Sequence, residues 1–510
     1  MGGVQCPNLQ IGDNIETISQ AKAWGTLTFF WNMRDMEMMQ NQEQHSDDYS
    51  NKWIYFGVSA LAAFMGTLDS SIVNVALPTL SEEFNADVDV VSWVALSYIL
   101  TMTALLLVAG KLLDIWGERK QFVIGFIMFT IGSALCAFSM SIYMLIFSRA
   151  FQALGGAVLM SSNQGLIAKG FPPHQRGRIL GTIGTVVSVG LASGPVLGGF
   201  LIEHLGWRSI FWINLPIGVI AVIYCLRTLE NNPSATREYK FDWRGSILMI
   251  IGLAAFFLGV NLWTDYGWQS PVVFGPVLGS LGVLGIFVYN ELRVPNPILN
   301  LTLLRIRYFS LSSLCAFIAF VGLMSNTILM PFYIQQVRGF SPQILGLFMM
   351  TVPLSMLLIA PFAGWLSDKI GTRIPATIGL TILGSGLYML SLLDQTSSHF
   401  EIVWHLFLVG FGMGVFASPN TNAILSAVPR SYVGVASGFN ALMRTSGITF
   451  GIAISVILFT FFRDIYTEGK ALSEAAQFMA GIHPAFKVAG FIIVIAIILS
   501  ASRGKRPNHE

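Results

Sequence analysis

Fourteen runs of about twenty apolar residues follow one another along the chain, separated by short segments that carry charges, glycines and prolines. A helical run of that length spans the hydrocarbon core of a bilayer. We predict transmembrane helices near residues 53–77, 90–110, 121–140, 143–168, 179–201, 209–228, 245–264, 271–290, 309–331, 343–366, 374–393, 401–426, 433–462 and 484–502. The pattern predicts an all-α polytopic membrane protein.

Composition agrees with this interpretation and excludes other classes. Hydrophobic residues make up 54% of the 510 and charged residues only 11%, too few to cover a water-facing surface. The cysteines Cys6, Cys136, Cys225 and Cys315 have the spacing of neither a disulfide framework nor a metal site. No phosphate-binding loop and no polar nucleotide-binding domain occurs, so we expect no cofactor, no metal, no enzymatic activity and no nucleic-acid partner.

The basic residues predict the orientation. Of the 29 lysines and arginines, 22 fall on the side of the N-terminus and five on the opposite side, while Arg149 and Arg444 lie within spans. Because cytoplasmic loops carry the excess of lysine and arginine, we expect both termini in the cytoplasm and the chain in the cytoplasmic membrane.

A repeat divides the chain into two halves. Residues 109–119 read AGKLLDIWGER and residues 363–373 read AGWLSDKIGTR, each directly after a span. We therefore predict two six-helix halves with two extra helices between them, as internal duplication is common in transporters. The expected parts are a polar, disordered cytoplasmic extension at 1–52, halves at 53–228 and 309–502, a linker with two helices at 229–308, and a tail at 503–510.

The repeated loop has a physical logic. Glycines permit a tight turn, the acid suits a helix N-terminus, and the arginine anchors the cytoplasmic side. Orientation alone would not require the same pattern twice, so we assign the loops a role in the conformational cycle, with helix orientation as the alternative. The residues are Gly110, Asp114, Gly117 and Arg119 in the first loop, and Asp368, Gly371 and Arg373 in the second.

Glycines recur at helical spacing in VGLASGPVLGG, residues 189–199, inside the fifth span. Gly190, Gly194 and Gly198 form one stripe, where small residues let two helices approach closely in lipid. Pro195, followed by Gly199 at the end of the stretch, removes one backbone hydrogen bond, which neighbouring helices can compensate. The stripe predicts either a gating contact or a generic close helix–helix contact.

Asp69 lies deep in the first span. An acid in mid-span is costly, and desolvation favours its neutral form, which suits a proton carrier. On a helical wheel it shares a face with small residues, so we expect it to look onto a small-residue surface or a cavity. The alternative is a neutral acid hydrogen-bonded to a neighbouring helix for packing.

A polar stripe follows the fourth span, with Arg149, Gln152, Gly156 and Asn163 on one helical face. Such a stripe points inward rather than toward lipid. Arg149 lies near the outer end of the span, so snorkelling of its side chain to the surface is the alternative.

Apart from Glu401, the first residue of span twelve, spans nine, ten, twelve and thirteen contain no carboxylate. An uncompensated Arg444 there suits an anionic or neutral amphipathic substrate, or else pairs with cytoplasmic-side carbonyls. Polar side chains within the spans are our candidates for the substrate cavity: Asn74, Gln152, Asn163, Asn326, Asn422, Asn440 and Arg444.

Several motifs resemble the major facilitator superfamily, in its fourteen-helix drug:proton antiporter branch (the EmrB/QacA type). They are LDSSIVNVALPTL in span one, GKLLDIWGERK after span two, RAFQALGGAV in span four, GLASGPVLGG in span five and WRSIFWINLPIG entering span six. The resemblance implies a major facilitator fold over about residues 53–505, a part for Arg149 in proton coupling, and a gate sealed where span five meets the other half. The second half lacks the extra intramembrane acids that several drug-exporting relatives carry there, which is a departure from the family pattern.

These observations predict proton-coupled efflux of amphipathic small molecules by alternating access, driven by the proton gradient. The expected partners are the lipid bilayer, the substrate and protons; the resemblance leaves open whether a periplasmic adaptor protein takes part. Three alternatives stay open: an exporter of one native metabolite or lipid, an uptake symporter, and a membrane sensor without transport.

Overall fold

The computed structural model describes residues 51–171, 173–229, 242–262, 270–294, 301–428, 433–468 and 472–504. The predicted extension falls outside them apart from residues 51 and 52, as does most of the predicted tail. Residues 54–510 form one compact unit, to which the following description applies. Every regular element in the described part of this unit is helical.

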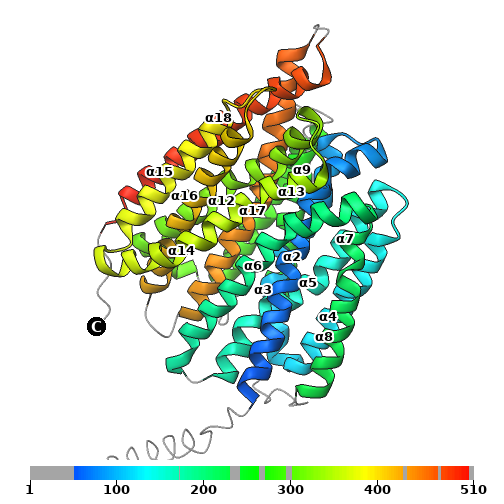
Figure 1. Ribbon diagram of the computed structural model, residues 1–510. Helices are drawn as coiled ribbons and strands as arrows, with labels where there is room; N and C mark the ends of the chain where they lie inside the picture. Colours follow the sequence, from blue (N-terminus) through cyan, green and yellow to red (C-terminus); the bar gives the residue numbers. More distant parts are fainter. Residues whose placement is uncertain are drawn as a thin grey trace, which may run out of the picture. The chain divides into compact units, whose positions relative to one another are not determined.

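The first half consists of long helices joined by tight connections (Figure 1). Their N-termini use ordinary caps where the sequence offers them: the Ser141 hydroxyl, for example, accepts a hydrogen bond from the backbone N–H of Met144 at 3.2 Å. The helices are α2 (Lys52–Phe84), α3 (Val88–Trp116), α4 (Glu118–Ala137), α5 (Ile142–Gly170), α6 (Pro173–Leu205), α7 (Ser209–Trp212) and α8 (Asn214–Thr228).

The second half repeats this order. Ser398 and Glu401 form a capping box at the start of α16, which fixes where that helix begins. The helices are α12 (Arg307–Phe332), which continues into a π-helical turn (Tyr333–Val337), α13 (Pro342–Met349), α14 (Thr351–Ile370), α15 (Arg373–Leu390), α16 (His399–Ser426), α17 (Val433–Thr467) and α18 (Glu474–Ala501).

Two further helices lie between the halves in sequence, α9 (Trp243–Asn261) and α11 (Pro271–Glu291). They pack against each other, and α9 also contacts α3 and α17, so the pair covers one seam between the halves. Asp242 caps α9 through the N–H of Gly245 at 2.9 Å and accepts a hydrogen bond from Asn290 of α11 at 2.7 Å. This buried acid therefore ties the two helices together.

Thirteen helices of the described chain are long and apolar enough to cross a membrane, and α9 contains a shorter apolar helix at residues 243–256. The fourteen predicted spans all coincide with helices, which confirms the fold class. Span six is divided between α7 and α8, and span ten between α13 and α14. Following the charge bias, we call the side where α2 begins the inner side and the opposite side the outer side.

The contacts between helices follow a pseudo-two-fold pattern. In the first half α5 packs against α3 and α4, and in the second half α16 packs against α14 and α15. Between the halves, α3 contacts α17, and α6 contacts α13 and α14. In each case the second span of one half meets the fifth span of the other, so the two contacts are equivalent. The arrangement is that of two copies of one six-helix unit facing each other.

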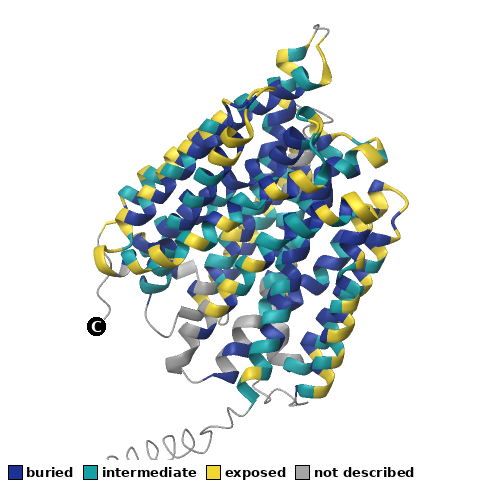
Figure 2. Ribbon diagram, in the orientation of Figure 1, coloured by how far each residue is buried: buried dark blue, intermediate teal, exposed yellow. Residues whose placement is uncertain are grey.

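Exposed residues lie along the flanks of the bundle (Figure 2), and many exposed residues of the described chain are large and apolar. Ile131 on α4, Leu281 on α11 and Ile498 on α18 are 49%, 53% and 62% exposed. Water would disfavour such continuous apolar faces, whereas lipid tails accept them. These faces therefore lie against the bilayer.

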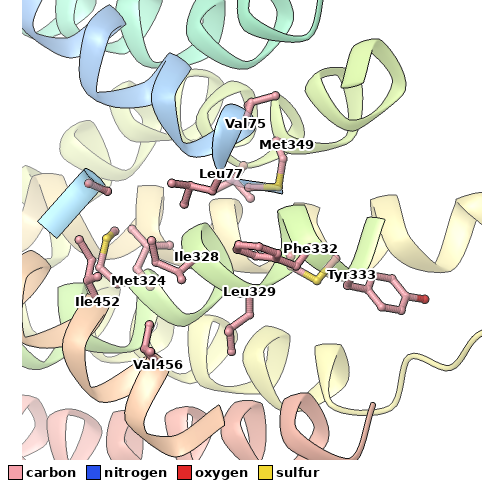
Figure 3. Packing of buried hydrophobic residues seen from close by; sticks show 14 of the residues in the cluster. Val75, Leu77, Met324, Ile328, Leu329, Phe332, Tyr333, Met349, Ile452 and Val456 are labelled. Atoms are coloured by element: carbon pink, nitrogen blue, oxygen red, sulfur yellow. The ribbon is translucent and has the colours of Figure 1, made fainter. Parts of the chain in front are cut away.

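On the outer side the halves share one apolar cluster. Figure 3 shows Val75 and Leu77 of α2 beside Met349 of α13 and Phe332 of α12. Farther inward, the described core splits into clusters drawn from the second half alone and from the first half alone. The halves are therefore joined most firmly near the outer surface.

Two polar contacts lie in the same outer region. The Gln335 amide donates a hydrogen bond to the Thr79 hydroxyl at 3.2 Å. The backbone N–H of Gln343, at the start of α13, donates to the Glu203 carboxylate of α6 at 3.0 Å. Each contact joins a residue of the first half to one of the second, so both would break if the outer side opened.

The glycine stripe of α6 packs within its own half. A Cβ atom added at Gly194 would lie 2.5 Å from Ser71 Oγ, and one at Gly198 would lie 2.7 Å from Ile72 Cγ1, both on α2. Gly190 likewise meets α2. These glycines therefore allow α2 and α6 to approach closely, while the contact with the other half that the resemblance implied for the bend is made by Pro195 and Gly199.

The neighbouring face of α6 makes the contact with the other half. A Cβ at Gly199 would collide with the backbone of Pro342, and a Cβ at Gly346 would collide with the carbonyl of Pro195. The glycine stripe lies on one face of α6, and Pro195 and Gly199 lie on the adjacent face. Helix α6 is therefore packed between α2 and α13.

We predict that Gly194→Ala destabilises the protein by about 1–3 kcal/mol, the range for overpacking a well-packed contact. Gly184→Ala is the matched control on the same helix, since a Cβ at Gly184 meets nothing within 4 Å. Denaturant unfolding in detergent measures both. Equal stabilities of the two variants would contradict the close packing of α2 on α6.

Candidate functional site

The centre of the first half contains a buried carboxylate. Asp69 lies near the middle of α2, and its side chain is 0% exposed. Val73 and Ala76 of the same helix are also fully buried. Charged groups are not left in such a place without partners, because desolvation would cost several kcal/mol.

Arg149 of α5 is the ionic partner. One guanidinium nitrogen, Nη1, lies 2.6 Å from Asp69 Oδ2, and the side chain of Arg149 is 1% exposed. Its Nε donates a hydrogen bond to the carbonyl of Val94 at 3.2 Å. The guanidinium also lies over the ring of Tyr98, 4.2 Å from its centroid, so α3 helps to hold the arginine in place.

Uncharged polar groups complete the site. The amide nitrogens of Gln152 and Asn214 donate to Asp69 Oδ1 at 2.9 and 2.8 Å. Both amides also donate to Ser133 Oγ, at 3.2 and 3.0 Å. The side-chain oxygen of Gln152 accepts from Arg149 Nη1 at 2.6 Å. The two oxygens of Asp69 thus receive three donors from α5 and α8.

This arrangement fits an ionised acid. A carboxylate accepts hydrogen bonds only, and here each of its oxygens faces N–H donors, one of them charged. A proton added to Asp69 would remove the attraction of Arg149 and put an O–H donor against other donors. The site therefore holds an acid whose protonation must change its surroundings.

The structure corrects the expectation about the surroundings of Asp69 and excludes the alternative given for Arg149. Asp69 faces polar side chains of α5 and α8 rather than a small-residue surface, because the polar partners come from helices that a wheel of α2 alone cannot show. Arg149 is buried in an ion pair instead of extending to the membrane surface. The acid is therefore arranged as one member of an ion pair and not as an isolated neutral group.

The site lies in the outer part of the bundle. Ser133 is one turn from the outer end of α4, and Asn214 is the first residue of α8. Every residue of the site belongs to the first half. This places the acid in the half and at the depth where the first helix approaches the cluster shared by the two halves.

Comparison with known proteins identifies the family. The model of the Major Facilitator Superfamily matches residues 59–452 and 312–510. The chain belongs to the Major Facilitator Superfamily. The motif resemblance to the superfamily is thereby confirmed, and the chain is a membrane transporter of that superfamily.

Curated relatives of this facilitator chain carry transporter names. It is 32% identical over 449 residues to the riboflavin transporter RibZ of Clostridioides difficile (strain 630), covering 88% of this chain and 97% of that protein. It is 33% identical over 397 residues to the multidrug resistance protein Stp of Mycobacterium tuberculosis (strain CDC 1551 / Oshkosh), covering 78% and 74%.

A solved structure supports the fold. A bacterial homologue of the human lysosomal transporter Spinster, in an inward-facing and unoccupied conformation, matches with a TM-score of 0.64. The match covers 90% of this chain and 97% of that one at 15% identity. At this identity the likeness shows the facilitator fold alone.

Equivalent glycine contacts align the two halves of the facilitator fold. Gly190 of α6 approaches the Phe64 carbonyl of α2, and Gly447 of α17 approaches the Phe317 carbonyl of α12. In this register Gly322 of α12 takes the place that Asp69 has in α2. The second half therefore has no acid at the equivalent point.

The partners of the acid are also missing from the second half. Gly155 of α5 and Gly412 of α16 are equivalent, since each faces a backbone nitrogen of the neighbouring helix. In this register Leu406 takes the place of Arg149, and Val409 that of Gln152. Both are 0% exposed. The same scaffold thus carries a charged cluster in one half and an apolar core in the other.

The repeated loops share a backbone conformation. Gly117 and Gly371 both have positive φ, 75° and 83°, which favours glycine in each copy of the motif. The Arg119 guanidinium donates to the carbonyl of Leu226 at 2.9 Å, linking the first loop to the end of α8. Arg373 begins α15 and is exposed.

Some predicted residues lie where side chains are not described: Gly110, Asp114, Asn163 and Asp368. The remaining substrate candidates are dispersed. Gln152 belongs to the ion-pair site, Asn326 is 1% exposed, Asn74 and Asn440 are half-buried, and Asn422 is half-buried with a partner. Gly156 lies against Tyr98, where an added Cβ would be 2.7 Å from the hydroxyl.

Sequence reasoning missed Ser133, Asn214 and Tyr98. Asn214 lies within WRSIFWINLPIG, a segment that carried the family resemblance, and it is the first polar residue after the aromatic pair that opens span six. An amide at the start of an apolar run is a signal for an inward partner. Ser133 and Tyr98 carry no such signal, because single hydroxyls are common in membrane helices.

We predict strong energetic coupling between Asp69 and Arg149. Asp69→Asn or Arg149→Gln alone should each lower the free energy of unfolding by about 3–5 kcal/mol, because each leaves an uncompensated buried group. The double variant should lose less than the sum of the two, by more than about 1 kcal/mol. Denaturant unfolding of the purified protein measures this cycle.

Glu83 and Arg208 supply the control cycle. They form an ion pair at 3.6 Å with both side chains more than 40% exposed. Removing either one should change stability by less than about 1 kcal/mol. If the buried pair showed no more coupling than this exposed pair, the buried interaction would have no special energetic role.

Proposed function

We propose that this chain is a proton-coupled exporter, in the fourteen-helix drug:proton antiporter branch, that moves amphipathic small molecules out of the cell by alternating access. The observation that carries the proposal is the Asp69–Arg149 ion pair, buried in the outer part of the first half. The fold does not require these charged residues, because the equivalent places in the second half are apolar.

A proton from outside would act on this pair first. Protonation of Asp69 removes its attraction for Arg149, which keeps its contacts with Val94 and Gln152 on α3 and α5. The tie between α2 and α5 then weakens. Ionisation of Asp69 restores it, so the two protonation states favour different positions of α2.

Helix α2 is placed to pass this change to the gate. Two residues beyond Asp69, Ser71 donates a hydrogen bond to the Leu191 carbonyl of α6 at 2.8 Å. One to two turns farther, Val75 and Leu77 enter the outer cluster shared by both halves. A shift of α2 would therefore disturb the contacts that hold the outer side closed.

Substrate that binds from the inner side would compete with the proton for the same conformational state of the protein. In this scheme export and proton entry alternate, and both termini lie in the cytoplasm. The names of relatives such as Stp support an exporter of foreign compounds.

A second candidate is the transport of one native solute. The relative named riboflavin transporter aligns over nearly its whole length, 97%, which favours a single-solute role as the alternative. The two candidates share the coupling site and differ only in the breadth of compounds accepted.

We predict that Asp69→Asn abolishes transport driven by a pH gradient while substrate counterflow continues. Asparagine matches the shape of aspartate but does not titrate, so exchange of substrate needs no proton, whereas net transport does. Proteoliposomes with an imposed pH gradient and a fluorescent substrate measure the first process, and preloaded liposomes without a gradient measure the second.

Loss of counterflow together with gradient-driven transport would indicate a damaged protein. Asp464→Asn is the control, because Asp464 is exposed and pairs with its neighbour Arg463 at 2.9 Å. This variant should keep both activities. Gradient-driven transport by Asp69→Asn at the wild-type rate would exclude Asp69 as the proton carrier.

We predict that a disulfide between Thr79→Cys and Gln335→Cys stops transport. The native side chains touch across the outer seam, so a covalent bond there prevents outward opening. Cys6 is changed to Ser as well, since the other three cysteines are buried. Transport before and after a reducing agent is the measurement.

Reduction should restore transport to the rate of each single-cysteine variant. Full transport by the crosslinked protein would show that the outer seam does not open during the cycle, which contradicts alternating access at this place.

A further inference from the structure

Arg444 is a charged residue that the coupling site does not use. It lies on α17 about three turns from the inner end of that helix, beside the buried residues Leu442 and Thr445. Its own side chain is nevertheless exposed. An accessible charge surrounded in sequence by buried residues needs an explanation.

The face that carries Arg444 points into the protein rather than toward lipid. Residues four and seven positions apart share a helix face, so Ile448 and Gly451 show its direction. A Cβ at Gly451 would lie 2.7 Å from the Val321 carbonyl of α12. Ile448 packs against the outer cluster and also against a cluster of the first half. Arg444 therefore lies on the inward face of α17, between α12 and the first half, and inward of the point where the halves join.

Arg444 has no partner of its own. Within the described residues it makes no hydrogen bond and no ion pair, and the surrounding protein desolvates it. No described carboxylate acts on it electrostatically. This excludes, for the described chain, the pairing with cytoplasmic-side carbonyls that the sequence left open.

The interior charges are therefore unequal between the halves. Asp69 and Arg149 neutralise each other. The glycine register that equates Gly447 with Gly190 places Val187 where the second half has Arg444, so this charge has no counterpart in the first half. Among the described residues, Arg444 is therefore an exposed positive charge within a span of the second half that has no ionic partner.

An uncompensated guanidinium selects anions. Its planar N–H groups match the two oxygens of a carboxylate, sulfonate or phosphate, and such charge-assisted hydrogen bonds are strongest where water is limited. A cationic compound at the same place would be repelled, and no acid among the described residues acts on Arg444 to offset the repulsion.

We propose that Arg444 binds an anionic group of the transported molecule, so that the substrates are amphipathic organic anions. The description of the bound molecule as a substrate rests on the proposed function, whereas the binding test does not depend on that function. It also separates two tasks in space: the proton is handled by the first half near the outer side, and the anion is bound by the second half farther in.

Two xanthene dyes of similar size and opposite charge test the proposal. Fluorescein is anionic at mildly alkaline pH and pyronin Y is cationic. Their binding to the full-length protein in detergent is measured by fluorescence anisotropy. The variants are Arg444→Gln, Arg444→Lys and, as the control on the same helix, Arg463→Gln, whose partly exposed arginine pairs with Asp464 near the outer end of α17.

We expect the wild-type protein to bind fluorescein, and Arg444→Gln to weaken that binding about tenfold or more, as for the loss of a charge-assisted contact. Arg444→Lys keeps the charge and should bind fluorescein within about threefold of wild type, since only the bidentate geometry is lost. Pyronin Y binding should be unchanged or tighter in Arg444→Gln. Arg463→Gln should resemble wild type for both dyes.

Three outcomes would overturn the proposal: no fluorescein binding by wild type, equal fluorescein binding by wild type and Arg444→Gln, or an equal loss for both dyes.

Transport in proteoliposomes separates the anion site from the proposed function. If the binding pattern holds but a pH gradient drives neither dye, the anion site stands and proton-coupled export fails. If the gradient drives pyronin Y and Arg444→Gln changes nothing, export stands and the anion site fails.

Discussion

The ion pair between Asp69 and Arg149 is the interaction on which the account depends. Burying two opposite charges costs more desolvation than their attraction returns unless further hydrogen bonds complete the site. Here amides from α5 and α8, a backbone carbonyl and an aromatic ring supply those contacts. The pair is therefore stable while both groups are charged, and it loses its electrostatic attraction when the acid is protonated.

The two halves show what the pair adds to the scaffold. Equivalent glycines bring equivalent helices together in both, yet Gly322 and Leu406 stand where the first half has Asp69 and Arg149. A six-helix unit of this kind folds with an apolar centre, so the charges are not needed for the fold. As we propose, duplication followed by divergence leaves proton chemistry to the first half and substrate charge to the second half through Arg444.

The sequence predicted most of the fold and part of the site. Apolar runs gave the fourteen helices, because the bilayer imposes their length, and the repeated loop motif has the same glycine conformation at Gly117 and Gly371. The pairing of Asp69 with Arg149 was not predicted, since it depends on which faces of α2 and α5 meet. Asn214 was missed for the same reason.

Infrared difference spectroscopy of the carboxyl stretch tests the central claim most directly. Addition of a transported compound to the purified protein should shift the balance between protonated and ionised Asp69, giving a carboxyl band that disappears in Asp69→Asn. A band that persists in that variant, or no carboxyl change on substrate addition in the wild type, would contradict the coupling of transport to this acid.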